Sequence, residues 1–419
     1  MILKVSKKNI YSFFSILLFT LYAFTIGLHQ YIYFKHYFGV ILSFSLSFLF
    51  MFLCNDFILQ RVDLVSFLVI LMSIIVITFN NWDFKSGEIS SSLIIIVGFL
   101  FFMISKNNNK WHSSGMEIIC FWGIMHSIFT IIALISPFVF KNIMMPLFTD
   151  NIYTHSMLKL YDQGCITGLA PHYSTNAMYL SVALGVPFSY YVVKKDNKYL
   201  GILLLMFIAL LLTGKRGPTI FVLLSMFLSY IFLNKNKGIK PVVKVIFMVL
   251  LGGVSLILVA DYIPELLNVF NRFIETYNKG DIGGGRYLLR LLAIHYFRKD
   301  FLFGIGWDGF RFLNNGIPGL KNASVHCVYL QLICEVGIVG CIPFFLFMFC
   351  SYYYIVGTLV RVISHSRNSV RSIALVYSIY MQTFFLLYCF TGNPLYDAPT
   401  LFMYIIACSI SYYYRIIDY

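Results

Sequence analysis

The chain has 419 residues, of which 59% are hydrophobic and 11% charged, and its formal net charge is +14. Soluble domains are about a quarter charged, so this composition excludes a soluble protein of any size. Apolar runs near the ~20 residues of a membrane-spanning helix recur along the whole length. We therefore predict an all-α, polytopic membrane protein.

We expect about 12 transmembrane helices, judged from runs of roughly that length. The first is not a cleaved signal peptide, because it is too long and no small-residue cleavage site follows it. In chain order the predicted spans cover residues 10–29, 37–59, 63–80, 90–105, 117–140, 173–193, 198–213, 218–234, 241–260, 326–357, 371–391 and 398–415.

Basic residues predict the orientation of these spans. Connections that alternate with the basic ones, at 30–36, 81–89 and 392–397, hold only Lys35 and Lys85. Basic connections remain in the cytoplasm, so both chain ends are expected there. The positive net charge reflects this bias and does not indicate nucleic acid as a partner. The basic residues on the predicted inner side are Lys4, Lys7, Lys8, Arg61, Lys106, Lys110, Lys194, Lys195, Lys198, Lys235, Lys237, Lys240, Arg361, Arg367, Arg371 and Arg415.

Two predicted outer segments depart from this charge pattern. The connection TGKRG at 213–217 carries Lys215 and Arg216 side by side. Ordinary loop charges are one interpretation, because long loops cross a membrane regardless of charge. Cationic groups that converge on an anionic substrate are the other. The long segment 261–325 carries Arg272, Lys279, Arg286, Arg290, Arg298, Lys299, Arg311 and Lys321.

A smaller outer loop is expected near 141–172, and its end reads ITGLAPHYSTNAMYL. His172, Tyr173 and Asn176 stand where the chain re-enters the membrane. Tyr and His are common anchors at a membrane interface, so each residue alone favours that role. Together with TGKRG and His326 they predict a polar rim on one surface. The last outer turn, TGNPLYDAP, fits a tight re-entry.

The stretch from Asp281 to Gly340 organises the rest of the chain. Arg286 and Arg290 are four residues apart, so on a helix they share a face and can grip one anion together. A Gly-rich aromatic turn follows at 303–310. His326 then precedes a long apolar run, with Ser324 expected as the helix N-cap.

Motifs for metals, nucleotides and disulfides are not found in the sequence. The nine cysteines lie mostly within predicted spans, where cysteine packs as a small apolar residue. No zinc-ligand spacing, GxxxxGK[ST] phosphate loop or DxD pair is present. We therefore expect no metal and no cofactor.

The segments FLFGIGWDGF and SVHCVYLQLICEVGIVG resemble the signature of the O-antigen polymerase and O-antigen ligase superfamily, which includes the Wzy-like polysaccharide polymerases. TGKRG resembles the TxSRG element of that family, GGGRYLLR its arginine-bearing loop helix, and TGLAPHYSTNAMYL its external loop exit. The signature departs at Cys327, where the family often has Asn or Ser. The matching positions of the helix are His326, Leu330, Glu335, Gly337 and Gly340.

The resemblance implies a metal-independent glycosyltransferase. Such enzymes transfer glycan from undecaprenyl diphosphate outside the cytoplasmic membrane of a bacterium, without a metal or nucleotide. Arg216 and Arg286 are expected to bind the donor diphosphate, with Arg290 and then Lys215 in support, because arginine forks bind phosphate bidentately. His326 is expected to act as the base for the acceptor hydroxyl.

Helix geometry extends these expectations below His326. On a continuous helix Gly337 lies about 20° and Gly340 about 40° from His326, which predicts a smooth strip for close helix packing or for a polyprenyl tail. Glu335 lies on the opposite face. A carboxylate within a membrane must be neutral, paired or hydrogen-bonded, so we expect a supporting or structural role.

We predict a polymerase of capsule or O-antigen-type repeat units, because TGNPLYDAP resembles polymerase members. A ligase that transfers glycan to a lipid or wall acceptor is the nearest alternative. A flippase for lipid-linked oligosaccharides is less favoured, because no internal repeat is visible and the notable charges lie in loops. A passive channel would need a ring of selectivity residues, and none is visible. Membrane lipids, a flippase and chain-length regulator proteins are the expected partners.

The expected organisation has three parts. Residues 1–260 hold the first nine spans and the smaller outer loop. Residues 261–325 form a large extracytoplasmic loop with the predicted active site, and residues 326–419 hold the last three spans.

Overall fold

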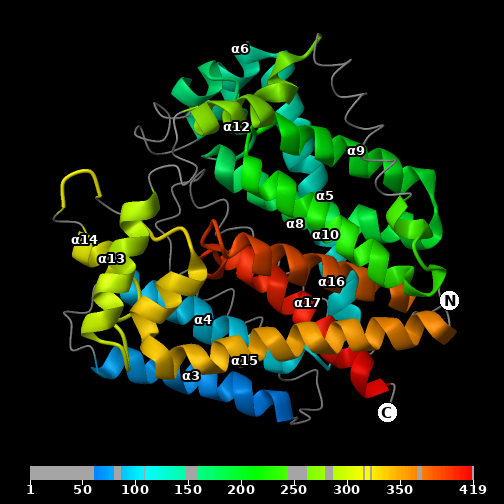
Figure 1. Cartoon of the computed structure of the whole chain (residues 1–419). Helices are drawn as coiled ribbons and strands as arrows, with labels where there is room; N and C mark the ends of the chain where they lie inside the picture. Colours follow the sequence, from blue (N-terminus) through cyan, green and yellow to red (C-terminus); the bar gives the residue numbers. More distant parts are fainter. Residues whose placement is uncertain are drawn as a thin grey trace, which may run out of the picture.

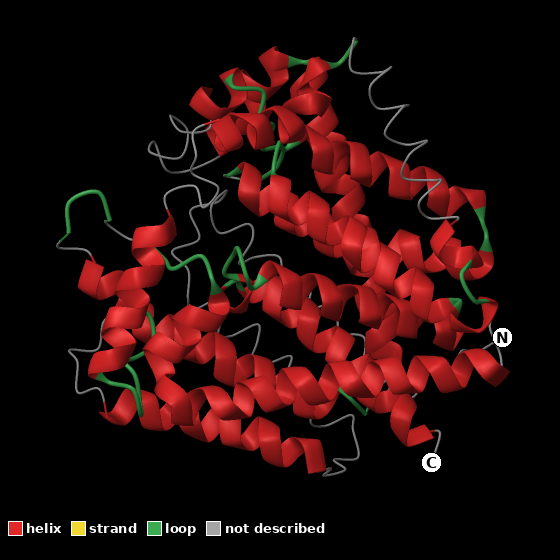
Figure 2. Cartoon of the chain, in the orientation of Figure 1, coloured by secondary structure: helices red, strands yellow, loops and turns green. Residues whose placement is uncertain are grey.

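A computed structural model describes residues 61–79, 86–107, 109–147, 158–170, 172–243, 262–278, 286–314, 317–320, 323–365 and 370–417. All the regular elements in these ranges are helices, and no strand occurs among them (Figure 2). The all-α prediction is therefore confirmed for this part of the chain. The predicted spans at 10–29 and 37–59, and nearly all of 241–260, lie outside the described residues.

Each of the other predicted spans overlaps a helix (Figure 1). The largest shifts concern α5, which begins earlier than predicted, and α15, which continues further. The helices that match the predicted spans are α3 (Arg61–Phe79), α4 (Ser86–Ser105), α5 (Asn109–Ile135), α8 (Tyr173–Lys194), α9 (Asn197–Leu212), α10 (Arg216–Leu233), α15 (Val328–His365), α16 (Val370–Tyr388) and α17 (Ala398–Ile417).

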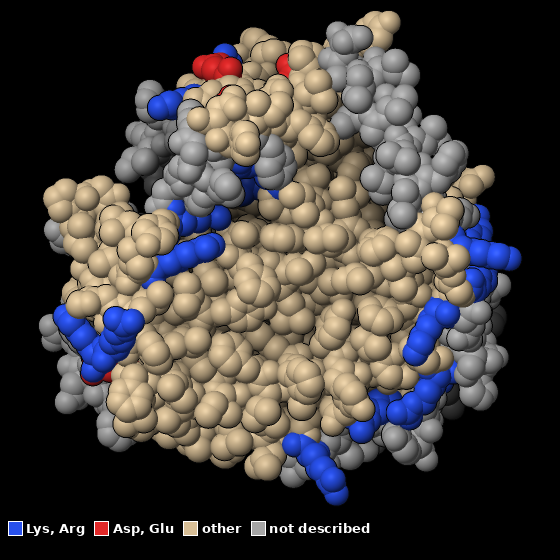
Figure 3. All heavy atoms as spheres, in the orientation of Figure 1, with Lys and Arg blue, Asp and Glu red and all other residues tan. Residues whose placement is uncertain are grey.

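Five described helices are long and apolar enough to cross a membrane: α8, α10, α15, α16 and most of α5. α9 and the central part of α4 are apolar but shorter. Figure 3 shows a broad area of the molecular face without charged side chains, with Lys and Arg gathered toward its margins. Such a band is typical of the part of a protein that lies in lipid. The chain is a multi-pass membrane protein.

The core lies where α8, α10, α16 and α17 pack together, and polar side chains there bond to backbone carbonyls. The Tyr380 hydroxyl of α16 donates to the Ser181 carbonyl of α8 at 2.6 Å, and Tyr404 of α17 stacks on Phe385 at 4.0 Å. Between α3 and α4, Lys106 Nζ lies 2.7 Å from Asp63 Oδ2 in a buried ion pair. Lys106 was predicted in the connection that follows residue 105, and it lies in the turn after α4, where this ion pair buries it.

Short helices occupy the ends of this bundle. α6 (Pro137–Val139), η1 (Phe140–Met144) and η2 (Met145–Leu147) follow α5, and η3 (Lys235–Lys237) follows α10. The predicted large loop contains helices where it is described, joined by turns. It holds η4 (Pro264–Leu267), α12 (Asn268–Asn278), α13 (Arg286–Lys299) and α14 (Gly309–Asn314), and η5 (Pro394–Tyr396) lies between α16 and α17.

α15 is kinked at Gly337, whose φ of 65° and ψ of −175° are not helical. The backbone of 301–306 packs against this kink. The N–H groups of Ile338 and Val339 donate to the Phe301 and Leu302 carbonyls at 2.9 and 3.2 Å, and the Gly306 N–H donates to the Glu335 carbonyl at 2.9 Å. Backbone groups that the kink removes from the helix ladder are thus paired with the turn.

Glycine is required at this contact. A Cβ on Gly337 would collide with the Leu302 carbonyl, and a Cβ on Gly304 would collide with the Glu335 carbonyl. The predicted smooth strip from His326 to Gly337 and Gly340 is therefore wrong, because the helix does not continue through Gly337 and begins only at Val328. The turn that contains Gly304, Ile305 and Gly306, called the GIG turn, and the kink at Gly337 are therefore one structural unit.

Candidate functional site

Tyr173, the first residue of α8, lies between two basic side chains. Lys215 Nζ and Arg272 Cζ each lie 5.0 Å from the centre of its ring. Contacts of this kind are cation–π interactions, which an aromatic ring makes with Lys or Arg. They join the start of α8 to the turn before α10 and to α12, three segments that are far apart in the sequence.

Arg216 extends this group. Its Nη1 donates to the Arg272 carbonyl oxygen at 2.8 Å, so the start of α10 is fixed against α12. A Cβ on the neighbouring Gly217 would lie only 3.3 Å from Thr391 Oγ1. The start of α10 is therefore also next to the turn that follows α16.

Arg286 and Arg290 reach the same turn from α13. Arg286 Nη1 donates to the Thr391 carbonyl at 2.9 Å, and Arg290 Nη2 to the Phe390 carbonyl at 3.4 Å. The two arginines thus share one helix face, as their spacing indicates. We call Lys215, Arg216, Arg272, Arg286 and Arg290 the cation cluster.

The electrostatics of the cation cluster favour an anion. Burial, together with the positive charges of Arg286, Arg272 and Arg216, lowers the pKa of Lys215 to about 8. Burial also lowers the pKa of Arg286, with Arg290 and Arg216 adding repulsion. Charges that repel one another in a half-buried region are stabilised by a bound anion, and guanidinium groups suit phosphate oxygens.

His326 lies in the field of the same cations. Burial lowers its pKa to about 4, and Arg286, Lys215 and Arg311 contribute repulsion. Its imidazole is therefore neutral near pH 7. The expected N-cap at Ser324 is wrong: α15 begins at Val328, and His326 lies in the preceding turn with a φ of 54°.

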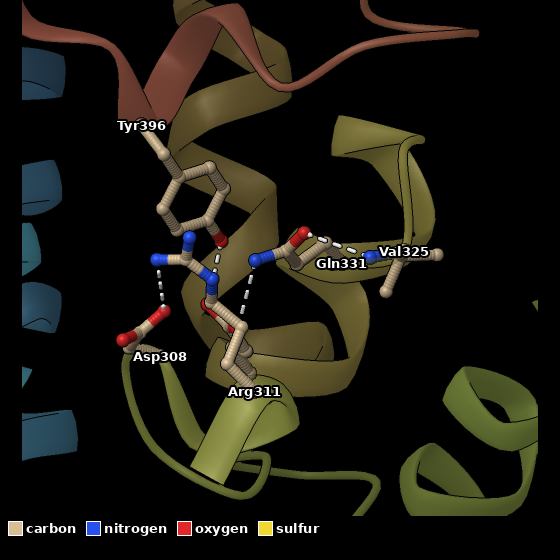
Figure 4. Close-up of polar contacts among 6 residues, drawn as sticks. Asp308, Arg311, Val325, Gln331 and Tyr396 are labelled. Carbon is tan, nitrogen blue, oxygen red and sulfur yellow. Dashed lines mark hydrogen bonds and ion pairs between the residues drawn. The ribbon is translucent and has the colours of Figure 1, made fainter. Parts of the chain in front are cut away.

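A buried hydrogen-bonded network holds this turn (Figure 4). The Val325 N–H donates to Gln331 Oε1 at 3.3 Å, and Gln331 Nε2 donates to Glu335 Oε1 at 3.0 Å. Tyr396 Oη donates to the other Glu335 oxygen at 2.6 Å. Glu335 is fully buried and far from solvent, so in this arrangement it supports the backbone next to His326.

The three residues predicted at the rim have different positions. His172 is the N-cap of α8: its Nδ1 accepts from the Ser174 N–H at 3.2 Å. Burial lowers the pKa of His172 to about 4, and Lys215 and Arg272 add to this effect. Tyr173 lies in the cation cluster as described.

Asn176 does not lie on a rim. It is fully buried, its Nδ2 donates to Thr130 Oγ1 at 2.9 Å, and its Oδ1 lies 3.1 Å from His126 Nδ1. This polar group joins α8 to α5 within the bundle. Its predicted role in substrate binding is wrong for this arrangement, because the side chain is occupied by helix packing.

Three features of the site were not predicted from the sequence. Arg272 was one basic residue among many in its segment, and only its distance from Tyr173 distinguishes it. Tyr388, at the end of α16, affects the pKa of Arg286. The Phe390 and Thr391 carbonyls are backbone groups, which no residue pattern reveals. Among the described residues, no three His, Cys, Asp or Glu side chains lie close enough together to hold a metal ion.

Comparison with known proteins agrees with the predicted resemblance. Residues 201–345 match a family model described as O-antigen ligase. The matched region begins in α9 and contains the cation cluster, the GIG turn, the kink at Gly337 and His326. A search of the curated proteins found no match. The match over residues 201–345 therefore supports the resemblance of this chain to the O-antigen ligase and polymerase superfamily.

Proposed function

We propose that the protein is a polysaccharide polymerase that joins oligosaccharide repeat units carried on undecaprenyl diphosphate, at the outer face of the cytoplasmic membrane. One observation carries the proposal: the cation cluster lies beside a neutral histidine within the residues that match the family. The product would be a capsule or O-antigen-type glycan.

The cation cluster suits the donor, whose diphosphate diester carries two negative charges and gains a third when the bond to the sugar breaks. A guanidinium has five N–H donors, and in Arg286 and Arg290 the described contact to a carbonyl occupies one nitrogen of each. The same two side chains can therefore hold phosphate oxygens while they remain anchored to the turn after α16. Lys215 and Arg216 would approach from the start of α10 and stabilise the charge of the leaving diphosphate.

His326 would take the proton of the acceptor. The acceptor hydroxyl oxygen forms a bond to the anomeric carbon of the donor, and the bond from that carbon to the diphosphate oxygen breaks. The diphosphate leaves with the electron pair, and the hydroxyl proton passes to the imidazole of His326. No co-reactant is needed, because the diphosphate ester is itself the activated donor.

Donor binding would prepare His326 for this step. The pKa of His326 is low partly because Arg286, Lys215 and Arg311 repel its protonated form. A bound diphosphate offsets these charges, and the pKa of the imidazole then rises toward its ordinary value. The histidine would become a competent base only when the donor is in place.

A ligase is the second candidate, because the matching family model is described as O-antigen ligase. Both reactions use the same donor and differ in the acceptor. The TGNPLYDAP turn favours the polymerase only because it resembles polymerase members. Its Thr391 carbonyl accepts a hydrogen bond from Arg286, and its Tyr396 hydroxyl donates one to Glu335. This turn is therefore part of the site and not only a re-entry.

A deletion strain tests the proposal directly. The lipid carrier and the surface glycan would be extracted and their glycans separated by size. Single repeat units that accumulate on the carrier, and that are accessible from outside, are the expected result. Full-length chains retained on the carrier would identify a ligase, and repeat units retained on the cytoplasmic side would identify a flippase.

A further inference from the structure

α13 exposes apolar side chains on the face opposite its buried residues. Tyr287, Leu291 and Ile294 recur at helical spacing, and Leu288 lies beside them. Tyr287 is 72% exposed and Leu288 53%. Leu289 and Ala293, on the other face, are buried in a cluster with residues of the turn before α14 and of α15. The exposed stripe has no packing partner among the described residues.

This stripe is continuous with a second one on α15. Phe301 and Leu302 are also exposed, and their carbonyls accept hydrogen bonds from Ile338 and Val339 at the start of the second part of α15. From there the exposed side chains of α15 recur at spacings of three and four residues. They are Ile338, Ile342, Leu346, Phe349 and Tyr353.

The stripe on α15 identifies what covers the stripe on α13. α15 is long and apolar enough to cross a membrane, so its exposed apolar side chains face lipid. Phe301 and Leu302 lie next to Ile338, the first residue of that stripe. Figure 1 shows α13 beside the start of α15 and transverse to the long part of that helix. A helix so placed lies along the membrane surface and does not project into water.

The last turn of α13 fits the same position. His295, Arg298 and Lys299 share the exposed face and follow the apolar stripe directly. Lysine and arginine at a membrane interface extend their charged ends to lipid phosphates while their stems remain on apolar surface. The exposed face of α13 therefore has an apolar part for acyl chains and a basic part for headgroups.

We propose that α13 lies in the plane of the membrane interface, with Tyr287, Leu288, Leu291 and Ile294 in contact with phospholipid acyl chains. Arg286 and Arg290 of the cation cluster lie on the flank of α13 between this stripe and the buried face. α13 is then a boundary helix, with lipid along its exposed face and an anion site along the adjacent flank. A lipid-anchored anion that diffuses in the membrane would reach these arginines around α13, without leaving the bilayer. The placement of α13 is independent of the reaction proposed above.

Spin labelling of the full-length protein tests the placement. A nitroxide at Leu291→Cys would be compared with Phe349→Cys, on the exposed stripe of α15, and with Pro318→Cys, in an exposed turn. The protein would be reconstituted in vesicles of phosphatidylethanolamine and phosphatidylglycerol. Collision rates with oxygen, which concentrates in lipid, and with a water-soluble nickel complex would be measured. Signal from native cysteines is subtracted with the unsubstituted protein.

The label at Leu291→Cys should collide more often with oxygen than with nickel, at a depth shallower than Phe349→Cys. The label at Pro318→Cys should show the opposite preference. Tyr287→Cys samples the same face and should agree with Leu291→Cys. Preference for nickel at both α13 positions would overturn the proposal, because the stripe would then face water. Strong spin–spin broadening there would overturn it as well, since a second copy of the chain would cover the stripe.

Discussion

Lys215 is the member of the cation cluster whose charge changes near neutral pH. Its pKa is lowered to about 8 by burial and by three arginines, so the ammonium is charged below that pH and loses its proton above it. We expect donor affinity to fall about tenfold between pH 7 and pH 9, the cost of one charge-assisted hydrogen bond. Binding of the lipid-linked donor would be measured against pH with purified protein.

The matched variants are Lys215→Arg and Lys198→Arg. An arginine at 215 stays charged, so the loss of affinity should move to higher pH. Lys198 is exposed at the start of α9, at the opposite end of α8 from Tyr173, and its variant should behave as the wild type. An unchanged profile in Lys215→Arg would show that another group causes the loss.

Arg286 tests the importance of the guanidinium shape. Arg286→Lys keeps the charge but loses the fork and the bond to the Thr391 carbonyl, so kcat/KM should fall by about 10- to 100-fold. Arg361→Lys is the control, because Arg361 is exposed in the distant last part of α15. Wild-type turnover in Arg286→Lys would show that the site needs only positive charge at this position.

His326 separates proton transfer from positioning. His326→Gln keeps hydrogen-bonding ability but cannot accept a proton at neutral pH, so kcat should fall by roughly 10²-fold or more while the donor still binds.

In the wild type, the acid limb of the pH profile of kcat should lie at higher pH than the acid limb of kcat/KM. The reason is that the free-enzyme pKa of about 4 rises when the diphosphate offsets Arg286 and Lys215. Coincident limbs, or a nearly active Gln variant, would remove the base role.

At the scale of elements, the sequence predicted well which residues share a helix face, but it did not predict where a helix is interrupted by a kink. The shared face of Arg286 and Arg290 follows from spacing within one helix, and the structure confirms it. The argument about Gly337 and Gly340 was wrong because it assumed a continuous helix. Whether α15 continues through Gly337 depends on the backbone of 301–306, which supplies the hydrogen bonds of the kink. A pattern within one segment contains no information about that partner.

The kink at Gly337 makes a prediction about stability. Gly337→Ala places a Cβ against the Leu302 carbonyl at a φ of 65°, so it should destabilise the protein by roughly 2–4 kcal/mol. Gly357→Ala is a matched control in the same helix, because a Cβ there meets nothing within 4 Å and alanine favours helix. Thermal unfolding in detergent would be compared. Equal melting temperatures for the two variants would contradict the tight packing of turn and kink.

At the scale of the whole molecule, composition was sufficient for the protein class, but the site was only partly predictable. Charges that oppose the inside bias indicated Lys215, Arg216 and Arg286, because charge is visible in a sequence. Asn176 was placed wrongly because a sequence shows that a residue is polar but not whether it is buried. This residue, next to a predicted rim, is buried against α5. Tyr388 and the Thr391 carbonyl join the site only through the packing of α10, α13 and α16. Sequence spacing does not show such contacts between distant segments.

The arrangement of the spans predicts which side of the membrane carries the cation cluster. α8 begins at Tyr173 in the site and ends at Lys194, and its 22 residues are about 33 Å long, enough to cross the apolar part of a bilayer. α10 and α15 likewise begin near the site and end near basic residues, Lys235 and Arg361. The end of the bundle away from the site therefore carries the residues that the positive-inside rule places in the cytoplasm.

Cysteine labelling in intact cells tests this orientation. Pro318→Cys, in the exposed turn between α14 and α15, should react with an impermeant thiol reagent without disruption of the membrane. Lys198→Cys, exposed at the start of α9, should react only after the membrane is opened. Both variants change exposed side chains and should assemble normally, which glycan synthesis in the same cells would verify. The reverse labelling pattern would place the cation cluster in the cytoplasm. An enzyme that polymerises exported repeat units would then have no access to its substrate, and the proposed function would be wrong.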